Sequence, residues 1–348
     1  MKGISVRVEA LTKHFGPVVA LKVLDLDINA GEMVAFLGPS GCGKTTTLLM
    51  IAGIYVPTAG AIYFGEKRVD HLHPRDRDVG MVFQSYALYP HLTVFDNVAF
   101  PLRLKRMPAA ELRRKVEQTA DLLGIGHVLE RRPGQVSGGQ QQRAALARAL
   151  VKEPQVLLLD EPLSNLDAQI RLQARGEIRR LQQEIGVTSI LVTHDQSEAL
   201  AMADRVAVFS VGELQQFATP EELYRRPATT FAASFVGHPP MNLLAGTFTG
   251  SEFVADGLRI PLPRAVPAGS GHLGIRPEDA HLRGAVPGRV VLVESLGRQA
   301  LVTLELNGAQ AKVVVDEASR PALGSEARLG YDPDALHLFD AAGRRIEG

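Results

Sequence analysis

Residues 38 to 45 read Gly38-Pro39-Ser40-Gly41-Cys42-Gly43-Lys44-Thr45 and match the pattern Gly-x-x-x-x-Gly-Lys-Ser/Thr of a phosphate-binding loop. Glycine carries no Cβ, so the backbone can turn sharply and present its N–H groups to phosphate oxygens. Lys44 adds a positive charge for the outer phosphates, and the Thr45 hydroxyl is a ligand for Mg²⁺. The stretch therefore predicts a P-loop α/β fold that binds a nucleoside triphosphate.

The segments on either side of this loop fit the prediction. Residues 33–37 are a continuous apolar run typical of a buried strand, and Thr46 opens an apolar stretch typical of a helix. A helix that begins here places the positive end of its dipole beside the phosphates. We therefore expect Thr46 to line the nucleotide site together with residues 38–45.

Composition sets the broad class of protein. The chain has 348 residues, more than one hydrophobic core usually spans, so we expect two domains. Lys and Arg number 38, and Asp and Glu also number 38. The chain therefore has no net positive charge that would favour binding to nucleic acid or to an anionic membrane. Cys42 is the only cysteine, so no disulfide can form within the chain. No signal segment or bilayer-spanning run is visible, and we expect a cytoplasmic protein that reaches a membrane only through a partner.

Strand and helix patterns alternate as far as residue 193, which predicts an α/β domain. Residues 156–159 and 189–193 are continuous apolar runs, as expected for strands buried on both faces of a parallel sheet. The expected strands are 4–8, 24–28, 33–37, 60–64, 79–83, 156–160 and 189–193, and the expected helices are 108–130, 140–152 and 169–184.

The composition changes near Gly237, where helical patterns fade and short β-type runs separated by Gly and Pro take over. Residues 289–293, 301–304 and 312–315 are examples, and they predict a small all-β barrel or sandwich. We place the domain boundary at 235/236, which gives domains of 1–235 and 236–348.

Two acids follow the apolar run at 156–159. A strand that ends in Asp160 brings a carboxylate to the carboxyl edge of the sheet, where ligands of open α/β folds bind, and Asp160 is the expected partner of Mg²⁺. Glu161 is not needed for the metal. We interpret it as the base that polarises the attacking water, which predicts hydrolysis of the nucleotide as well as binding.

Ser137-Gly138-Gly139-Gln140 has two interpretations. Ser-x-x-Gln is a capping box, which starts the following helix. Two glycines at a helix N-terminus also form a second anion site. One nucleotide does not need two such sites in one chain, so our hypothesis is that two copies face each other. Each ATP is then held by the Lys44 loop of one copy and the Ser137 loop of the other.

His194 and Gln84 complete the candidate site. His194 directly follows the strand at 189–193, so it should lie at the same sheet edge as Asp160 and can reach a γ-phosphate. Gln84 follows the strand at 79–83 and is positioned to contact the metal or the water. A lone residue of either kind is more often ordinary than catalytic, and their place at this edge is what favours a role.

Together these segments resemble the ABC-transporter ATPases, whose Walker A, Q-loop, signature, Walker B, D-loop and H-loop follow in the same order. The matching segments are 38–45, Gln84, 136–140, 157–161, 164–167 and His194. The resemblance covers residues 1 to about 235 and implies a helical subdomain at about 88–155 and a head-to-tail ATP dimer. It also implies that Phe15 stacks on adenine, although a core aromatic is an equal alternative. Val136 stands where Leu is usual and Asn165 where Ala is common.

The tail is similar to that of the ATPase subunits of bacterial carbohydrate importers of the maltose and glycerol-3-phosphate type. Residues 235–242 and 274–278 resemble that group's entry into a C-terminal OB-type (TOBE) regulatory domain. The resemblance implies integral membrane permease partners, docked around residues 85–91, and indirectly an extracytoplasmic solute-binding protein. The subunit would then sit peripherally on the inner face of the cell membrane. Polyamine, iron and sulfate importers share related tails, so these solutes remain alternatives.

A nucleic-acid function is the remaining alternative. An ABC-type ATPase that acts on nucleic acid usually carries a coiled-coil insertion or a second ATPase unit, and neither is present. An OB-type nucleic-acid surface needs basic and aromatic residues. From Pro239 onward eleven Lys and Arg stand against thirteen Asp and Glu, with no Trp. We therefore expect no nucleic-acid partner.

Overall fold

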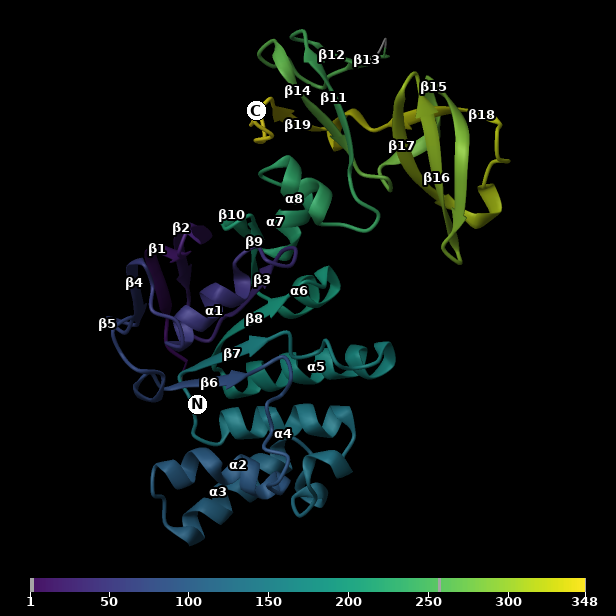
Figure 1. Cartoon of the computed structure of the whole chain (residues 1–348). Coiled ribbons are helices and arrows are strands. Elements are labelled where there is room, and N and C mark those ends of the chain that lie inside the picture. The colour runs from purple at the N-terminus through teal and green to yellow at the C-terminus, as the bar shows by residue number, and fades with distance from the viewer. Residues whose placement is uncertain (1–2, 256–257, 348) are drawn as a thin grey trace. The chain divides into compact units, whose positions relative to one another are not determined.

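The computed structural model describes residues 3–255 and 258–347 of the chain (Figure 1). The chain divides into two compact units, Met1–Pro220 and Glu221–Gly348. Each unit has its own hydrophobic core.

A six-stranded sheet forms the centre of the first unit. Its order is β10-β9-β3-β8-β7-β6, and only the pair β10–β9 is antiparallel. Its strands are β3 (Met33–Leu37), β6 (Val79–Val82), β7 (Val156–Asp160), β8 (Thr188–Thr193), β9 (Arg205–Ser210) and β10 (Glu213–Ala218). Leu157 and Leu159 of β7 pack into one core cluster, while Val156 and Leu158 pack into another. Burial on both faces explains the continuous apolar run.

A second, antiparallel sheet has the order β2-β1-β4-β5. Its strands are β1 (Val6–Phe15), β2 (Val18–Ile28), β4 (Ala59–Phe64) and β5 (Lys67–Arg68). Helix α1 (Lys44–Ala52) shares one core cluster with this sheet and with the central sheet. The alternation at 4–8 and 24–28 thus belongs to strands longer than the sequence predicts.

Helices cover the other face of the central sheet. Three of them lie between β6 and β7 along the chain: α2 (Val94–Leu104), α3 (Ala109–Leu122) and α4 (Gly138–Leu150), and two more follow β7 and β8: α5 (Ala168–Ile185) and α6 (Gln196–Met202). Leu112, Val116 and Ala120 of α3 are buried, as their spacing predicts. The helix ends well before residue 130 because Gly124 adopts a left-handed conformation with φ 66°.

The second unit is built mainly of strands, as predicted. Two short helices, α7 (Pro220–Arg225) and α8 (Thr230–Phe235), precede two antiparallel sheets of order β13-β12-β11-β14-β19 and β17-β16-β15-β18. The strands are β11 (Asn242–Phe248), β12 (Glu252–Ala255), β13 (Leu258–Pro261), β14 (Gly269–Ile275), β15 (Ala280–Ser295), β16 (Gln299–Leu306), β17 (Ala309–Asp316), β18 (Glu326–Tyr331) and β19 (His337–Asp340). Both sheets contribute to one core.

The division after Pro220 lies upstream of the boundary at 235/236 that the composition suggests. Arg276 accounts for the difference. Its guanidinium is buried and donates hydrogen bonds to the carbonyl oxygens of Tyr224 (2.5 Å) and Val236 (2.9 Å), which fixes α7 and the end of α8 to β14. The change in composition marks the point at which helices give way to strands. The boundary between the units lies earlier because α7 and α8 make their contacts with the second unit.

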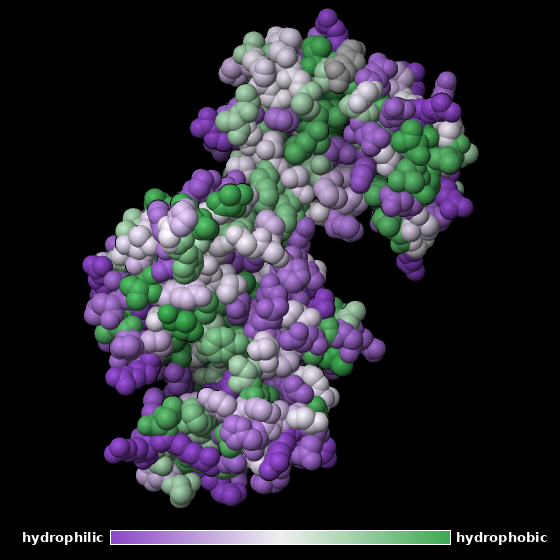
Figure 2. Space-filling model, in the orientation of Figure 1, coloured by the Kyte–Doolittle hydropathy of each residue, from purple (hydrophilic) through white to green (hydrophobic). Residues whose placement is uncertain are grey.

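The surface mixes hydrophobic and hydrophilic groups, and Figure 2 shows green groups separated by purple ones on the visible face of both units. Among the described helices, none combines the length and the apolar character required to cross a membrane.

Candidate nucleotide-binding and hydrolysis site

The predicted chemical groups meet at one edge of the central sheet. The neighbouring strands β3, β8, β7 and β6 are parallel, so their carboxyl ends lie side by side in that order. The phosphate-loop segment 38–43 follows β3, His194 follows β8, Asp160 ends β7, and Gln84 lies two residues after β6. Parallel topology therefore assembles the site from segments that are far apart in sequence.

The loop 38–43 needs glycine for two different reasons. Gly41 and Gly43 have φ of 79° and 104°, a conformation that side chains disfavour. Gly38 has no such φ, but a Cβ there would lie only 2.7 Å from Cys42 Sγ. Pro39, Ser40 and Gly41 are exposed at the crest of the loop, whereas Cys42 is buried beneath it.

Helix α1 begins directly after this loop. No side chain caps its N-terminus at Gly43, so the N–H groups of the first turn, which includes Thr45 and Thr46, are available to an anion. Lys44 is 5% exposed, and its Nζ donates to the carbonyl oxygens of Gly38 (2.7 Å) and Pro39 (2.9 Å). Within the described part of the chain no carboxylate forms an ion pair with Lys44, which leaves its charge to be matched by a phosphate.

Thr45 and Asp160 form a pair of oxygen ligands. The Thr45 hydroxyl donates a hydrogen bond of 3.1 Å to Asp160 Oδ1 across the ends of α1 and β7. Burial raises the pKa of Asp160, and the nearby charge of Glu161 raises it further. A bound cation would stabilise the charged carboxylate of Asp160 and so oppose both causes of the raised pKa. A hydroxyl and a carboxylate are oxygen ligands of the kind that Mg²⁺ binds beside phosphates. The residues present therefore fit Mg²⁺.

Glu161 is held by two side chains from the segments that follow the neighbouring strands β6 and β8. Gln84 Nε2 donates to Glu161 Oε2 at 3.1 Å, and His194 Nδ1 lies 3.0 Å from Glu161 Oε1. The backbone of Glu161 has φ 45°, which is unusual for a residue with a side chain and is characteristic of functional sites. Its carbonyl accepts from the Ser164 hydroxyl at 2.9 Å, which secures this conformation.

Two further residues, Asn165 and Gln142, support this cluster, and the sequence reasoning missed their contribution. Asn165 Nδ2 donates to the carbonyl oxygen of Gln84 at 2.6 Å, so it fixes the backbone that carries the Gln84 side chain. The buried Gln142 of α4 donates to the carbonyl oxygen of Pro162, next to Glu161, at 3.0 Å. Asn165 stood out only as a departure from the family pattern, and no sequence signal marked Gln142.

The Ser137 segment forms the capping box that its pattern suggests. Ser137 Oγ accepts from the Gln140 N–H, and Gln140 Oε1 accepts from the Ser137 N–H at 3.0 Å. Gly138 and Gly139 occupy the first turn of α4. In residues 3–255 and 258–347, no hydrogen bond or ion pair links this segment to the loop 38–46.

Comparison with known proteins agrees with this geometry. The family model of the ABC transporter matches residues 21–164, and that of the TOBE domain matches residues 273–339. The sequence is 45% identical over 361 residues to the trehalose/maltose import ATP-binding protein MalK of Thermococcus litoralis, covering 96% of this chain and 97% of that protein. It is 47% identical over 356 residues to the sn-glycerol-3-phosphate import ATP-binding protein UgpC of Ruegeria pomeroyi, covering 98% and 99%.

This chain belongs to the ABC transporter ATPases. A solved dimer of an ATP-binding cassette in a post-hydrolysis state, with ADP and phosphate bound, matches with a TM-score of 0.56 and 33% identity, covering 62% of this chain and 98% of that one. The predicted P-loop fold and its C-terminal TOBE domain are confirmed.

Phe15 of this ABC ATPase is not a core aromatic. It lies at the end of β1 with 42% of its surface exposed, and its ring contacts Tyr55 edge-on. The structure therefore removes one of the two interpretations of Phe15 and leaves adenine stacking as a hypothesis.

A groove of 360 Å³ lies over the carboxyl side of α4. Tyr89 and Phe100 supply aromatic walls, and Arg148 and Lys152 supply positive charges. Arg148 donates to the carbonyl oxygens of Tyr86 and Ala87, whereas burial lowers the pKa of Lys152. This surface includes part of the segment 85–91 that the family resemblance marks as a dock.

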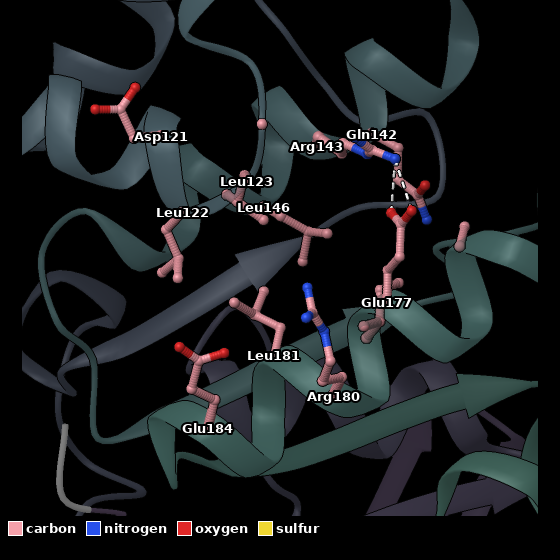
Figure 3. Close-up of a pocket in the computed structure, with 13 residues that line it drawn as sticks. Asp121, Leu122, Leu123, Gln142, Arg143, Leu146, Glu177, Arg180, Leu181 and Glu184 are labelled. Carbon is pink, nitrogen blue, oxygen red and sulfur yellow. Dashed lines mark hydrogen bonds and ion pairs between the residues drawn. The ribbon is translucent and has the colours of Figure 1, made fainter.

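A second pocket, of 310 Å³, lies between α3, α4 and α5 and contains none of the predicted site residues. Figure 3 shows Leu122, Leu146 and Leu181 around it, and an ion pair joining Arg143 of α4 to Glu177 of α5 at 2.7 Å. This pair fixes the helix that begins after Ser137 against the helix that follows the Glu161 loop.

Proposed function

We propose that this protein is the ATP-binding and ATP-hydrolysing subunit of an ABC importer, and that its solute is a carbohydrate or a related polyol. The observation that carries the proposal is Glu161, which is held between Gln84 and His194 beside the Thr45–Asp160 pair. A chain that only bound nucleotide would not need a carboxylate positioned in this way.

The residues divide into those that bind ATP and those that act on water. Lys44 and the N–H groups of residues 38–46 bind the phosphates, and Thr45, Asp160 and Gln84 would hold Mg²⁺, which neutralises charge on the outer phosphates when bound. Glu161 accepts a proton from the attacking water as the bond to the γ-phosphoryl group breaks, and ADP and phosphate are released. His194 keeps Glu161 oriented through the contact of 3.0 Å between its Nδ1 and Glu161 Oε1, and it would donate to the phosphoryl oxygens of bound ATP.

The second half of the site comes from another copy of the chain. In the chain's own fold, a Cβ at Gly138 or Gly139 would meet nothing closer than 3.5 Å, so folding alone does not require glycine there. Close approach of an external group does require it. Ile170, which lies beside Gly139, is 39% exposed, as expected for a residue that a partner covers. We infer that the segment 137–140 of each copy contacts the ATP bound by the other.

The groove beside Tyr89 is the expected dock for a cytoplasmic segment of the permease subunits. It combines the exposed ring of Tyr89 and the half-buried ring of Phe100 with the half-buried charge of Lys152, a composition typical of interaction surfaces. Through this contact the subunit would act on the inner face of the cell membrane, and an extracytoplasmic binding protein would deliver the solute to the permease. The solute itself never touches this chain.

The carbohydrate assignment follows from similarity along nearly the whole chain. Relatives 44–47% identical are named as ATP-binding proteins for the import or transport of trehalose and maltose, sn-glycerol 3-phosphate, sulfoquinovosyl glycerol, and xylose and arabinose. All six solutes are sugars or polyol derivatives. This pattern favours a carbohydrate over the polyamine, iron or sulfate alternatives.

Reconstitution tests the proposed function. The subunit would be co-expressed with the membrane proteins encoded beside its gene, and phosphate release would be measured in proteoliposomes with the solute-binding protein. We expect maltose or glycerol 3-phosphate to stimulate hydrolysis. Stimulation by putrescine, ferric iron or sulfate alone would replace the carbohydrate assignment, and stimulation by single-stranded DNA would overturn the transport assignment.

A further inference from the structure

The Phe15 ring is held in a small aromatic cluster at the end of β1. Its centroid lies 5.3 Å from that of Tyr55, with the two planes at 76°. Lys13 Nζ lies over the Phe15 ring at 4.7 Å and over the Tyr55 ring at 5.8 Å, and it donates to the Val56 carbonyl at 2.7 Å. Edge-to-face pairs and cations over aromatic faces are both stabilising. The ring of Phe15 is therefore oriented by two neighbours.

The backbone around Tyr55 is tied to both β1 and α1. The His14 N–H donates to Thr58 Oγ1 at 2.9 Å, and the Thr58 N–H donates to the Thr12 carbonyl at 2.9 Å. On the other side, the Tyr55 N–H donates to the Leu49 carbonyl of α1 at 3.2 Å. Tyr55 therefore has a fixed position relative to the strand that carries Phe15.

Helix α1 links this cluster to the phosphate loop. The helix begins at Lys44 and ends at Ala52, a length of about 13 Å, and Gly53 caps it in a left-handed conformation. At the beginning of α1 the strand β2 packs closely, since a Cβ on Gly43 would lie 2.7 Å from the Ala20 carbonyl oxygen. The β1–β2 hairpin is thus fixed near both ends of α1. Phe15 therefore has a fixed position relative to the phosphate-binding loop.

We infer that Tyr55 is a positioning residue for base recognition, acting together with Lys13 through the ring of Phe15. The inference rests on the proposed stacking of Phe15 on adenine. Phe15 and Tyr55 are 42% and 36% exposed, so their contact is not part of the hydrophobic core. A free phenylalanine ring would lose rotamer freedom when a base stacks on it. Tyr55 and Lys13 hold the ring before the nucleotide arrives, and the base stacks on the part of the Phe15 ring that remains exposed.

Equilibrium binding to the full chain tests this inference, with ATP and inorganic tripolyphosphate as the two probes. Tripolyphosphate reports on the phosphate loop alone because it has no base. The variants are Y55A, Y55F and F15A, with Y63A as the matched control because Tyr63 is also a partly exposed tyrosine beside a cation, at 4.7 Å from Arg7. We expect Y55A to weaken ATP binding about three- to tenfold and to leave tripolyphosphate binding unchanged.

The variants separate this inference from the proposed stacking. Y55F keeps the ring contact and should bind ATP as the wild type does, as should Y63A. If F15A weakens ATP binding and Y55A does not, the role of Tyr55 is wrong while stacking on Phe15 stands. If F15A has no effect on ATP binding, the stacking itself is wrong. Equal loss of both ligands in Y55A would mean general damage to the site and would also overturn the inference.

Discussion

At the scale of single residues, three contacts hold Glu161, the proposed base, in one orientation. Its carboxylate bonds to Gln84 on one side and lies beside His194 on the other, and its backbone is held by Ser164. Orientation is a large part of what a general base contributes to catalysis, so these contacts support the proposed role of Glu161.

Replacement of Glu161 by glutamine separates hydrolysis from binding. E161Q keeps the size of the side chain and loses the base, so we expect phosphate release to fall by a factor of about 10²–10⁴ while ATP affinity remains. Phosphate release and equilibrium ATP binding are the two measurements. Hydrolysis at the wild-type rate would show that another group accepts the proton.

Asn165 provides a milder test at the same site. Its amide supports the backbone of Gln84 through a hydrogen bond of 2.6 Å. N165A removes this hydrogen bond. If the bond stabilises the transition state by about 1 kcal/mol, hydrolysis should slow roughly fivefold, while ATP binding should not change. Steady-state kinetics would check it, and N165A kinetics equal to those of the wild type would mean that Gln84 is held adequately without Asn165.

The residues of the phosphate loop were predictable from sequence because their spacing is local. Asp160 and His194 were predictable because each follows a buried strand, and parallel strands bring their carboxyl ends together. The contacts of Asn165 and Gln142 were not predictable from sequence. Each contact joins two segments that are far apart in the chain and come together only in the folded structure. Phe15 could not be assigned for a similar reason, because exposure at a strand end is a property of the assembled sheet.

At the scale of elements, α4 begins at the proposed second anion site. Gly138 lies at its first turn, where the chain's own fold leaves room for a side chain. G138D places a negative charge where the partner's phosphates would lie, so hydrolysis should fall to background while ATP binding to the single chain persists. G134D is the control, because Gly134 is also exposed, has open space around it and stands upstream of the capping box. Loss of ATP binding in G138D would contradict the two-copy site.

In the second unit, β19 carries a buried histidine that makes stability depend on pH. Burial, with the charges of Arg345 and Arg276, lowers the pKa of His337 to about 4. In the unfolded chain His337 therefore becomes protonated near pH 6.5, whereas in the folded chain it stays neutral until the pH approaches 4. The stabilisation is complete above pH 6.5 and is lost as the pH falls toward 4, by about 3 kcal/mol in all.

Thermal unfolding between pH 7 and pH 4 checks this prediction. The unfolding temperature of the second unit should fall with pH in the wild type, and the fall should be smaller in H337Q, which cannot be protonated. An equal pH dependence in both proteins would assign the effect to other groups.

The ends of some helices and strands could be predicted from sequence patterns, and the ends of others could not. The strands at 33–37 and 156–160 were predicted residue for residue because both faces are buried. The helix at 109–122 was predicted too long because hydrophobic residues continue past its end in a non-helical turn. Arg276 lies in the segment 274–278 that resembles the family pattern, but the sequence did not predict its burial or its hydrogen bonds to Tyr224 and Val236, which fix α7 and the end of α8 to β14.

At the scale of the whole molecule, one chain carries the two separate surfaces that the proposed reaction requires. The Lys44 loop and the Ser137 segment are each complete as local structures, and no hydrogen bond or ion pair within residues 3–255 and 258–347 links them. Under the proposed two-copy arrangement, ATP would be hydrolysed only when two copies close, and closure would be coupled to movement of the permease.

Light scattering on the E161Q variant, with ATP and Mg²⁺, tests this claim most directly. The account predicts a species of twice the 37.6 kDa mass of the chain, which disappears without nucleotide and when G138D is added to the variant. A species of 37.6 kDa that binds ATP but does not pair would contradict it.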